Sequence, residues 1–101
     1  MMESIELFNS LNEKFELEQT KEIAPTMDAV HDLLTSKIIY LLSINPEKLF
    51  ALLYRIDVSE HIVQQIFNSS HSSELAGKLA DAVIERQLEK LETQAFYRKM
   101  N

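Results

Sequence analysis

The sequence has no cysteine, a single glycine and only two prolines among its 101 residues. The absence of cysteine excludes a disulfide framework, a thiolate nucleophile and a Cys-ligated zinc site. Because Gly77 is the only glycine, the glycine-rich loops that cradle nucleotide phosphates are excluded as well. Few helix-breaking residues leave long stretches that permit helix, so the sequence favours an all-α protein.

The sequence also lacks a long apolar run and an excess of positive charge. No segment reaches the ~18 consecutive apolar residues of a membrane span, and Glu3 and Glu6 stand where a signal peptide would be basic. We therefore expect no membrane association and a cytoplasmic location. The net charge of -6 repels phosphate backbones, and Arg98 and Lys99 are the one basic cluster, so a nucleic-acid partner is disfavoured.

Residues 1–25 are predicted to form an appended amphipathic helix and a connector. Over residues 3–16 the apolar side chains share one arc of a helix: Ile5, Leu7, Phe8, Leu11 and Phe15. From Leu17 to Pro25 the helical period is lost, which is typical of a connector. Such a helix can dock on its own chain or on a neighbour's.

Residues 26–101 are predicted to form a helical bundle domain. Thr26 is a suitable N-cap for a helix to about residue 43, and Asn45-Pro46-Glu47 is a strong start for a third helix. Asp57 and Glu60 have capping-box spacing, which predicts a short fourth helix, and Ser72 begins a long fifth helix. We expect a compact bundle of about five helices, with the second and fifth as the central pair.

The fifth helix, Ser72 to Lys99, carries Gln87 within its apolar stripe, and a buried amide there needs a hydrogen-bond partner. At ~1.5 Å per residue this helix is roughly 40 Å long, more than two short helices can cover. Its last turns therefore need the N-terminal helix or a second chain as a partner.

Few polar residues have the spacing of a metal-binding or catalytic site. The three histidines lack the i, i+3 or i, i+4 spacing of metal ligands, and His31 on the apolar arc is best interpreted as a core or interface residue that is hydrogen-bonded to a neighbour. The acids of the last helix, from Asp81 to Glu92, resemble an ordinary charged surface. We expect no catalytic residue, no cofactor and no metal, and hence no enzyme.

Two strings resemble a group of short, uncharacterised helical bacterial proteins: LFALLYRIDVSE, residues 49–60, and ADAVIERQLEK, residues 80–90. The resemblance covers roughly residues 28–99. It implies a compact helical fold and no catalytic activity.

These observations predict a non-enzymatic protein-interaction module that binds another protein or self-associates as a dimer. The expected contact residues are the aromatic and apolar side chains of the two ends, Phe8, Leu11, Phe15, Leu91, Phe96 and Tyr97. The alternative is a domain that binds a small anionic ligand or nucleic acid through Arg55 and Arg86, since guanidinium groups suit carboxylates and phosphates. The structural interpretation of Arg55, Asp57 and Arg86, which we favour, is an ion pair at a helix corner.

Overall fold

The structure, a computed structural model, describes residues 2–17 and 26–100, and the side chains of residues 4–17 and 26–98. These residues form five α-helices and no strand: α1 (Met2–Phe15), α2 (Met27–Ile44), α3 (Pro46–Ile56), α4 (Glu60–Ser69) and α5 (Ser72–Met100). The prediction of an all-α bundle with a long C-terminal helix is confirmed. Most of the predicted connector, residues 18–25, lies outside the described residues.

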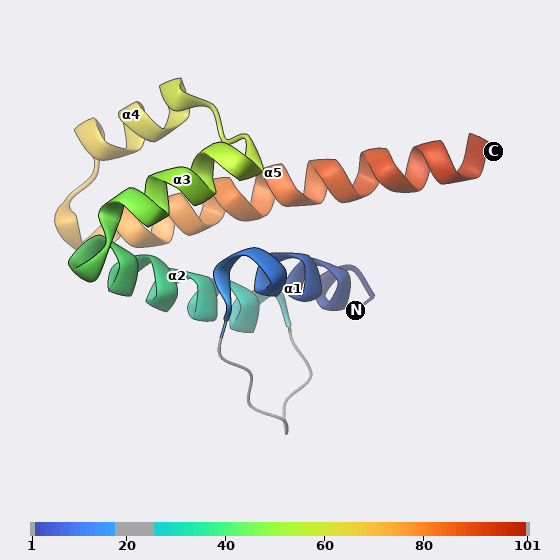
Figure 1. Ribbon diagram of the computed structural model, residues 1–101, viewed down its shortest axis with the longest axis horizontal. Helices are drawn as coiled ribbons and strands as arrows, with labels where there is room; N and C mark the ends of the chain where they lie inside the picture. The colour runs from blue at the N-terminus through green and yellow to red at the C-terminus, as the bar shows by residue number, and fades with distance from the viewer. Residues whose placement is uncertain (1, 18–25, 101) are drawn as a thin grey trace.

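The bundle is built around α2 and α5, which share the most extensive contact of any two helices. Figure 1 shows α1 and α3 lying against this pair and α4 outermost. Both α1 and α3 contact α2 as well as α5, whereas the main contact of α4 is with α5. The C-terminal turns of α5 project beyond the other helices (Figure 1).

Two of the predicted helix starts carry the expected side-chain caps. The Thr26 hydroxyl accepts a hydrogen bond from the Ala29 amide at 3.1 Å, and the Asn45 side chain accepts one from the Lys48 amide at 3.3 Å. Pro46 occupies the first turn of α3. The backbone N–H groups of a first turn have no acceptor within the helix, so the missing N–H of proline costs no hydrogen bond there.

The predicted capping box at Asp57 is wrong. Asp57 closes α3 instead, in the left-handed conformation with φ 69° and ψ 42°, and its amide donates to the carbonyls of Leu53 and Tyr54. Ser59 precedes α4 but makes no side-chain cap. An aspartate tolerates this backbone better than most residues because its short polar side chain suits left-handed geometry.

Helices α1, α2, α3 and α5 each contribute fully buried side chains to the core, whereas the side chains of α4 are buried less. The largest of the side chains that are less than 2% exposed are Leu7, Leu11, Phe15, Val30, Leu34, Ile38, Leu49, Ile56, Leu79 and Val83. No residue of α4 is buried to this extent; Val63, Ile66 and Phe67 pack on the core while partly exposed. Within the described residues, no helix is long and apolar enough to cross a membrane.

Candidate interaction surface and basic cluster

The N-terminal helix docks on its own chain, which corrects part of the predicted interaction surface. Phe8, Leu11 and Phe15 are 2%, 0% and 1% exposed and belong to the same core cluster as the side chains of α2 and α5. Their burial follows from the position of α1, which contacts both central helices. These three residues stabilise the bundle and are not exposed for a contact with another molecule.

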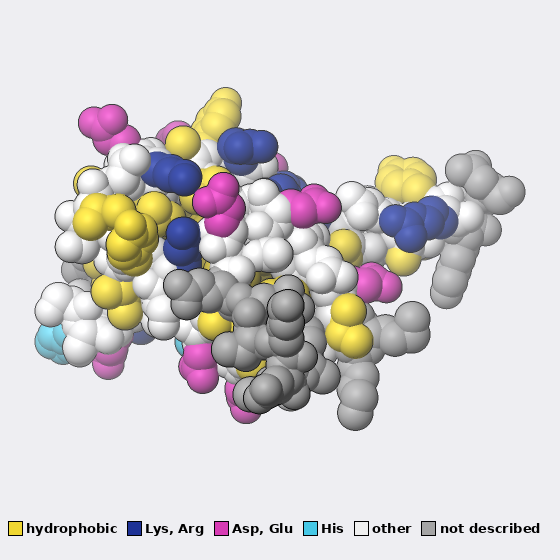
Figure 2. All heavy atoms as spheres, turned by 60° about the horizontal axis from the view of Figure 1, so that its bottom comes forward, with side chains coloured by type: hydrophobic (Ala, Val, Ile, Leu, Met, Phe, Trp, Pro, Cys, Tyr) yellow, Lys and Arg dark blue, Asp and Glu magenta, His cyan; other side chains and the backbone are white. Residues whose placement is uncertain are grey.

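The other half of the predicted surface, the C-terminal end of α5, is exposed. We call residues 91–98 the overhang. Phe96 and Tyr97 are 60% and 63% exposed, and their rings meet edge to face with centroids 6.0 Å apart. Figure 2 shows the projecting end of α5 with hydrophobic and basic side chains, separated from the body of the molecule.

A shallow groove runs where the overhang leaves α1. It has a volume of about 220 Å³ and is lined by Glu6 of α1 and by Leu88, Leu91, Glu92 and Ala95 of α5. Beyond the first turns of α1, this apolar stripe has no neighbouring helix within the described part of the chain.

Other exposed apolar side chains were not singled out from the sequence. At the passage from α2 to α3, Ile39, Tyr40 and Ile44 are more than half exposed. A second groove, of about 340 Å³, lies between α3 and α4 and includes Phe50, whose ring is 5.7 Å from that of Phe67. Figure 2 shows hydrophobic side chains gathered at the end of the molecule away from the overhang.

The two arginines of the predicted anion site have different surroundings in the structure. The Arg86 guanidinium donates from Nε to the Asp57 carbonyl at 3.2 Å and from Nη2 to the Asp57 carboxylate at 3.1 Å. Arg86 thus fastens the α3–α4 corner to α5. Arg55 is exposed and forms no ion pair with any described residue. The corner ion pair exists, and it is made by Arg86.

Gln87 has the partner that its burial requires. It is 3% exposed, and its side-chain oxygen accepts a hydrogen bond from Lys14 Nζ of α1 at 3.3 Å. One turn further along α5, burial and the charges of Lys14 and Arg86 lower the pKa of Lys90, and Asp57 opposes this in part. Lys14, Arg86 and Lys90 therefore form a basic cluster where α1, α5 and the α3–α4 corner meet.

The sequence analysis missed Lys14 and Lys90 in this role. Lys90 follows Arg86 by four residues, a spacing that places both on one side of α5 and was readable from the sequence. The contribution of Lys14 was not readable, because it depends on how α1 docks 73 residues away from Gln87.

The interpretation of His31 as a hydrogen-bonded interface residue is confirmed. His31 Nε2 lies 3.2 Å from the Gly77 carbonyl and 2.9 Å from the Asp81 carboxylate, so it links α2 to α5. A Cβ atom on Gly77 would lie 4.0 Å from His31 Cε1, an ordinary van der Waals distance. Here α2 and α5 are close, but their approach does not require glycine.

The remaining candidates are ordinary surface groups. Asp81 is paired with His31, and Glu89 lies 3.9 Å from Arg86. Among the described residues, no three His, Asp or Glu side chains are grouped so that they could hold a metal ion. No family model, curated protein or solved structure matches the chain. The resemblance of residues 49–60 and 80–90 to helical bacterial proteins stays a prediction.

Proposed function

We propose that this protein is a non-enzymatic interaction module that self-associates through the overhang of α5, with a second copy of the chain as its partner. The supporting observation is an apolar stripe on α5 that packs on the core at Leu88 and Leu91 and continues past the bundle without cover. Leu88, Leu91 and Ala95 recur at intervals of three and four residues, the spacing of a coiled-coil seam. Leu91 is only partly buried and Ala95 is exposed.

The charges on this segment favour an antiparallel pair. Glu85 precedes the stripe and Glu89 and Glu92 lie within its length, whereas Arg98 follows it. If Ala95 of one copy packs on Leu91 of the other, Arg98 falls at the level of Leu88 in the second copy, next to Glu89 of that copy, and the same pairing repeats by symmetry. A parallel pair would set like charges side by side, which costs stability.

The contact extends from the overhang onto α1. Glu6 lines the same groove as Leu91 and Ala95, and Ile5 nearby on α1 is 43% exposed. The segment is short, so the interface belongs with the small, transient ones below about 1,200 Å² of buried surface. We expect a dissociation constant on the order of 0.1 mM, which corresponds to roughly 5 kcal/mol of association free energy.

Sedimentation equilibrium of the full chain, from about 10 µM to 1 mM, tests this proposal because such a range brackets the expected constant. Ala95→Glu places a charge in the centre of the seam and should leave the protein monomeric throughout. Ala51→Glu is the matched control, because Ala51 is also an exposed helical alanine, on α3. It should dimerise as the unaltered chain does.

Charge exchange tests the orientation. Arg98→Glu should weaken the dimer, and adding Glu89→Arg in the same chain should restore it, because each pair across the interface then has opposite charges again. A chain that stays monomeric at 1 mM, or an equal effect of Ala51→Glu and Ala95→Glu, would contradict self-association by the overhang. Failure of the double substitution to restore the dimer would contradict the antiparallel arrangement.

A further inference from the structure

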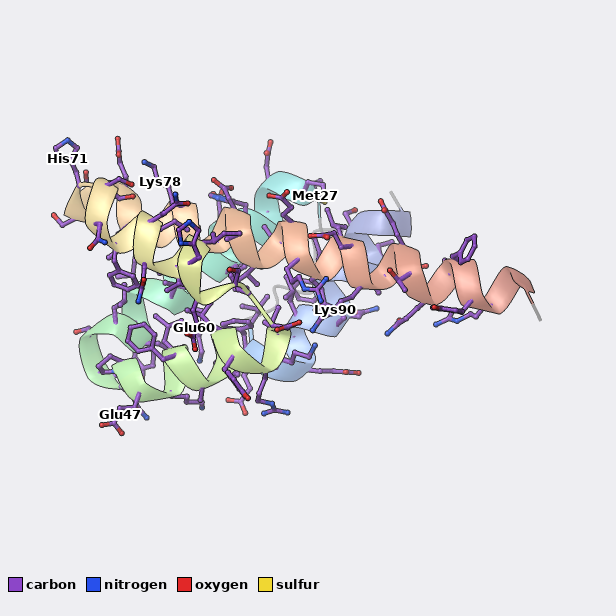
Figure 3. All side chains as sticks on the ribbon, turned by 90° about the horizontal axis from the view of Figure 1, so that it is seen from above. Met27, Glu47, Glu60, His71, Lys78 and Lys90 are labelled. Carbon is purple, nitrogen blue, oxygen red and sulfur yellow. The ribbon has the colours of Figure 1, made fainter. Side chains whose placement is uncertain are left out.

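The basic cluster has donors that the protein itself does not use. Lys14 Nζ donates to Gln87, which leaves two of its three N–H groups free for another acceptor. Lys90 has no ion-pair partner among the described residues. Figure 3 shows Lys90 on the side of α5 next to α1, the helix that supplies Lys14.

The cluster has fewer acids than bases in contact with it. Asp57 and Glu89 are the two acids paired there, and both contact Arg86 rather than a lysine. Glu89 is the more distant, at 3.9 Å. Arg86 is held by the Asp57 carbonyl and carboxylate, so its position is fixed before any ligand arrives.

The geometry points to a binding site for a phosphate dianion between Lys14 and Lys90, next to the Arg86 guanidinium on α5. Two ammonium groups on neighbouring helices can donate to different oxygens of one tetrahedral anion. Because Asp57 and Glu89 already pair with Arg86, the unpaired positive charge is that of the two lysines, and a doubly negative ion matches it. A carboxylate has only one charge to set against them, so phosphate fits the cluster better.

The partial burial of the lysines makes the site stronger than an exposed pair of cations. Lys14 and Lys90 are each only partly exposed, and Gln87 beneath them is buried. Water screens charges less in such surroundings. Burial and the neighbouring cations lower the pKa of Lys90, which is the response expected of a cluster whose positive charge is not balanced.

Phosphate titration of the full chain at pH 8 and constant ionic strength tests the site, since phosphate is then doubly charged. The readout is the NMR signal of each lysine side chain. We expect saturable shifts at Lys14 and Lys90, and a bound dianion should raise the pKa of Lys90 back toward its ordinary value.

Lys14→Gln and Lys90→Gln should each weaken phosphate binding about tenfold or more, the loss of one charge-assisted hydrogen bond. Lys78→Gln is the matched control, because Lys78 is an exposed lysine of the same helix that pairs with Glu74 at 3.6 Å. It should leave the affinity unchanged. Far-ultraviolet circular dichroism verifies that all three variants fold.

Two ligands distinguish free phosphate from a phosphate group carried on another molecule. Tighter binding of inorganic phosphate than of O-phosphoserine assigns the site to the free ion, and the reverse order assigns it to a phosphomonoester. Lysine shifts that sodium chloride reproduces at equal ionic strength would overturn the inference. So would a loss of affinity in Lys78→Gln as large as in Lys14→Gln and Lys90→Gln.

Discussion

Helices α1 and α4 are both short, amphipathic and packed against α5, yet they contribute to the core to different degrees. In α1, Leu7, Leu11 and Phe15 are at most 1% exposed. In α4, Phe67 is among the best covered side chains and is still only partly buried. The helix that the sequence placed outside the bundle is thus more deeply embedded than one placed within it.

The difference comes from what lies beneath each helix. Helix α1 contacts both α2 and α5, so two neighbours cover its apolar face. Helix α4 contacts chiefly α5, and its Phe67 ring meets α3 at Phe50. Helical periodicity identifies the face that turns inward, whereas the depth of burial depends on how many neighbours receive that face. We therefore expect α4 to open locally at a lower free energy than α1.

The largest expected effect tests this comparison with one residue type. Phe15→Ala should lower the free energy of unfolding by about 3–5 kcal/mol, because it empties a fully buried site. Phe67→Ala should cost roughly 1–2 kcal/mol, because a partly exposed side chain loses less apolar burial. Urea unfolding of both variants measures the difference.

Phe15→Leu serves as a milder substitution if Phe15→Ala does not fold at all. Phe15→Leu should still lower the free energy of unfolding more than the same substitution in α4, Phe67→Leu. Equal losses at the two positions would mean that α1 is not docked in solution as the structure has it.

The corner at Asp57 provides a second test, since it fixes where α4 begins. Asp57→Ala removes the hydrogen bond to Arg86 Nη2 and puts a Cβ-bearing, non-polar residue at φ 69°. Asp57→Gly removes the same bond without that strain. Alanine should therefore be less stable than glycine by about 1 kcal/mol, measured by urea unfolding. Hydrogen exchange should show loss of protection first at the amides of α4. Equal free energies of unfolding for the alanine and glycine variants would contradict the left-handed conformation at residue 57.

The smallest expected effect concerns Lys90, which lies between α1 and the corner. Its lowered pKa means that the folded chain releases this proton before the unfolded chain does, so the charge destabilises the fold below that pKa. Lys90→Gln should raise the free energy of unfolding at pH 7 by a few tenths of a kcal/mol. The advantage should disappear as the pH approaches 10.5, where the unfolded lysine also loses its charge. An advantage independent of pH would contradict this origin.

Local signals in the sequence predicted the helices well. The caps at Thr26 and Asn45 and the proline at residue 46 are short-range features, and each was confirmed. Asp57 was misassigned because the capping-box spacing to Glu60 also fits a residue that ends the preceding helix. The backbone conformation decides whether Asp57 ends α3 or caps α4. An aspartate is compatible with the left-handed conformation, so the residue type alone does not reveal it.

Tertiary relations were harder to predict. An amphipathic face indicates that a helix is buried, but it does not indicate whether the helix packs on its own chain or on a second one. The sequence therefore could not decide where Phe15 docks. Gln87 was expected to need a partner, but Lys14 could not be named because that contact joins α1 to α5. For the candidate site, Arg86 and the exposed end at Phe96 were predicted, and the spacing of Lys90 from Arg86 could have been read from the sequence, whereas Lys14 required the assembled bundle.

The placement of the aromatic side chains determines how optical spectroscopy reports on this protein. The sequence contains no tryptophan, and Tyr40, Tyr54 and Tyr97 are 53%, 79% and 63% exposed. Tyrosine emission consequently monitors the surface, and its change on unfolding should be small. Tyr97 is nevertheless useful as a local probe. If Tyr40 and Tyr54 are replaced by phenylalanine, the remaining tyrosine fluorescence comes from Tyr97, and its quenching or anisotropy reports on the end of α5 alone.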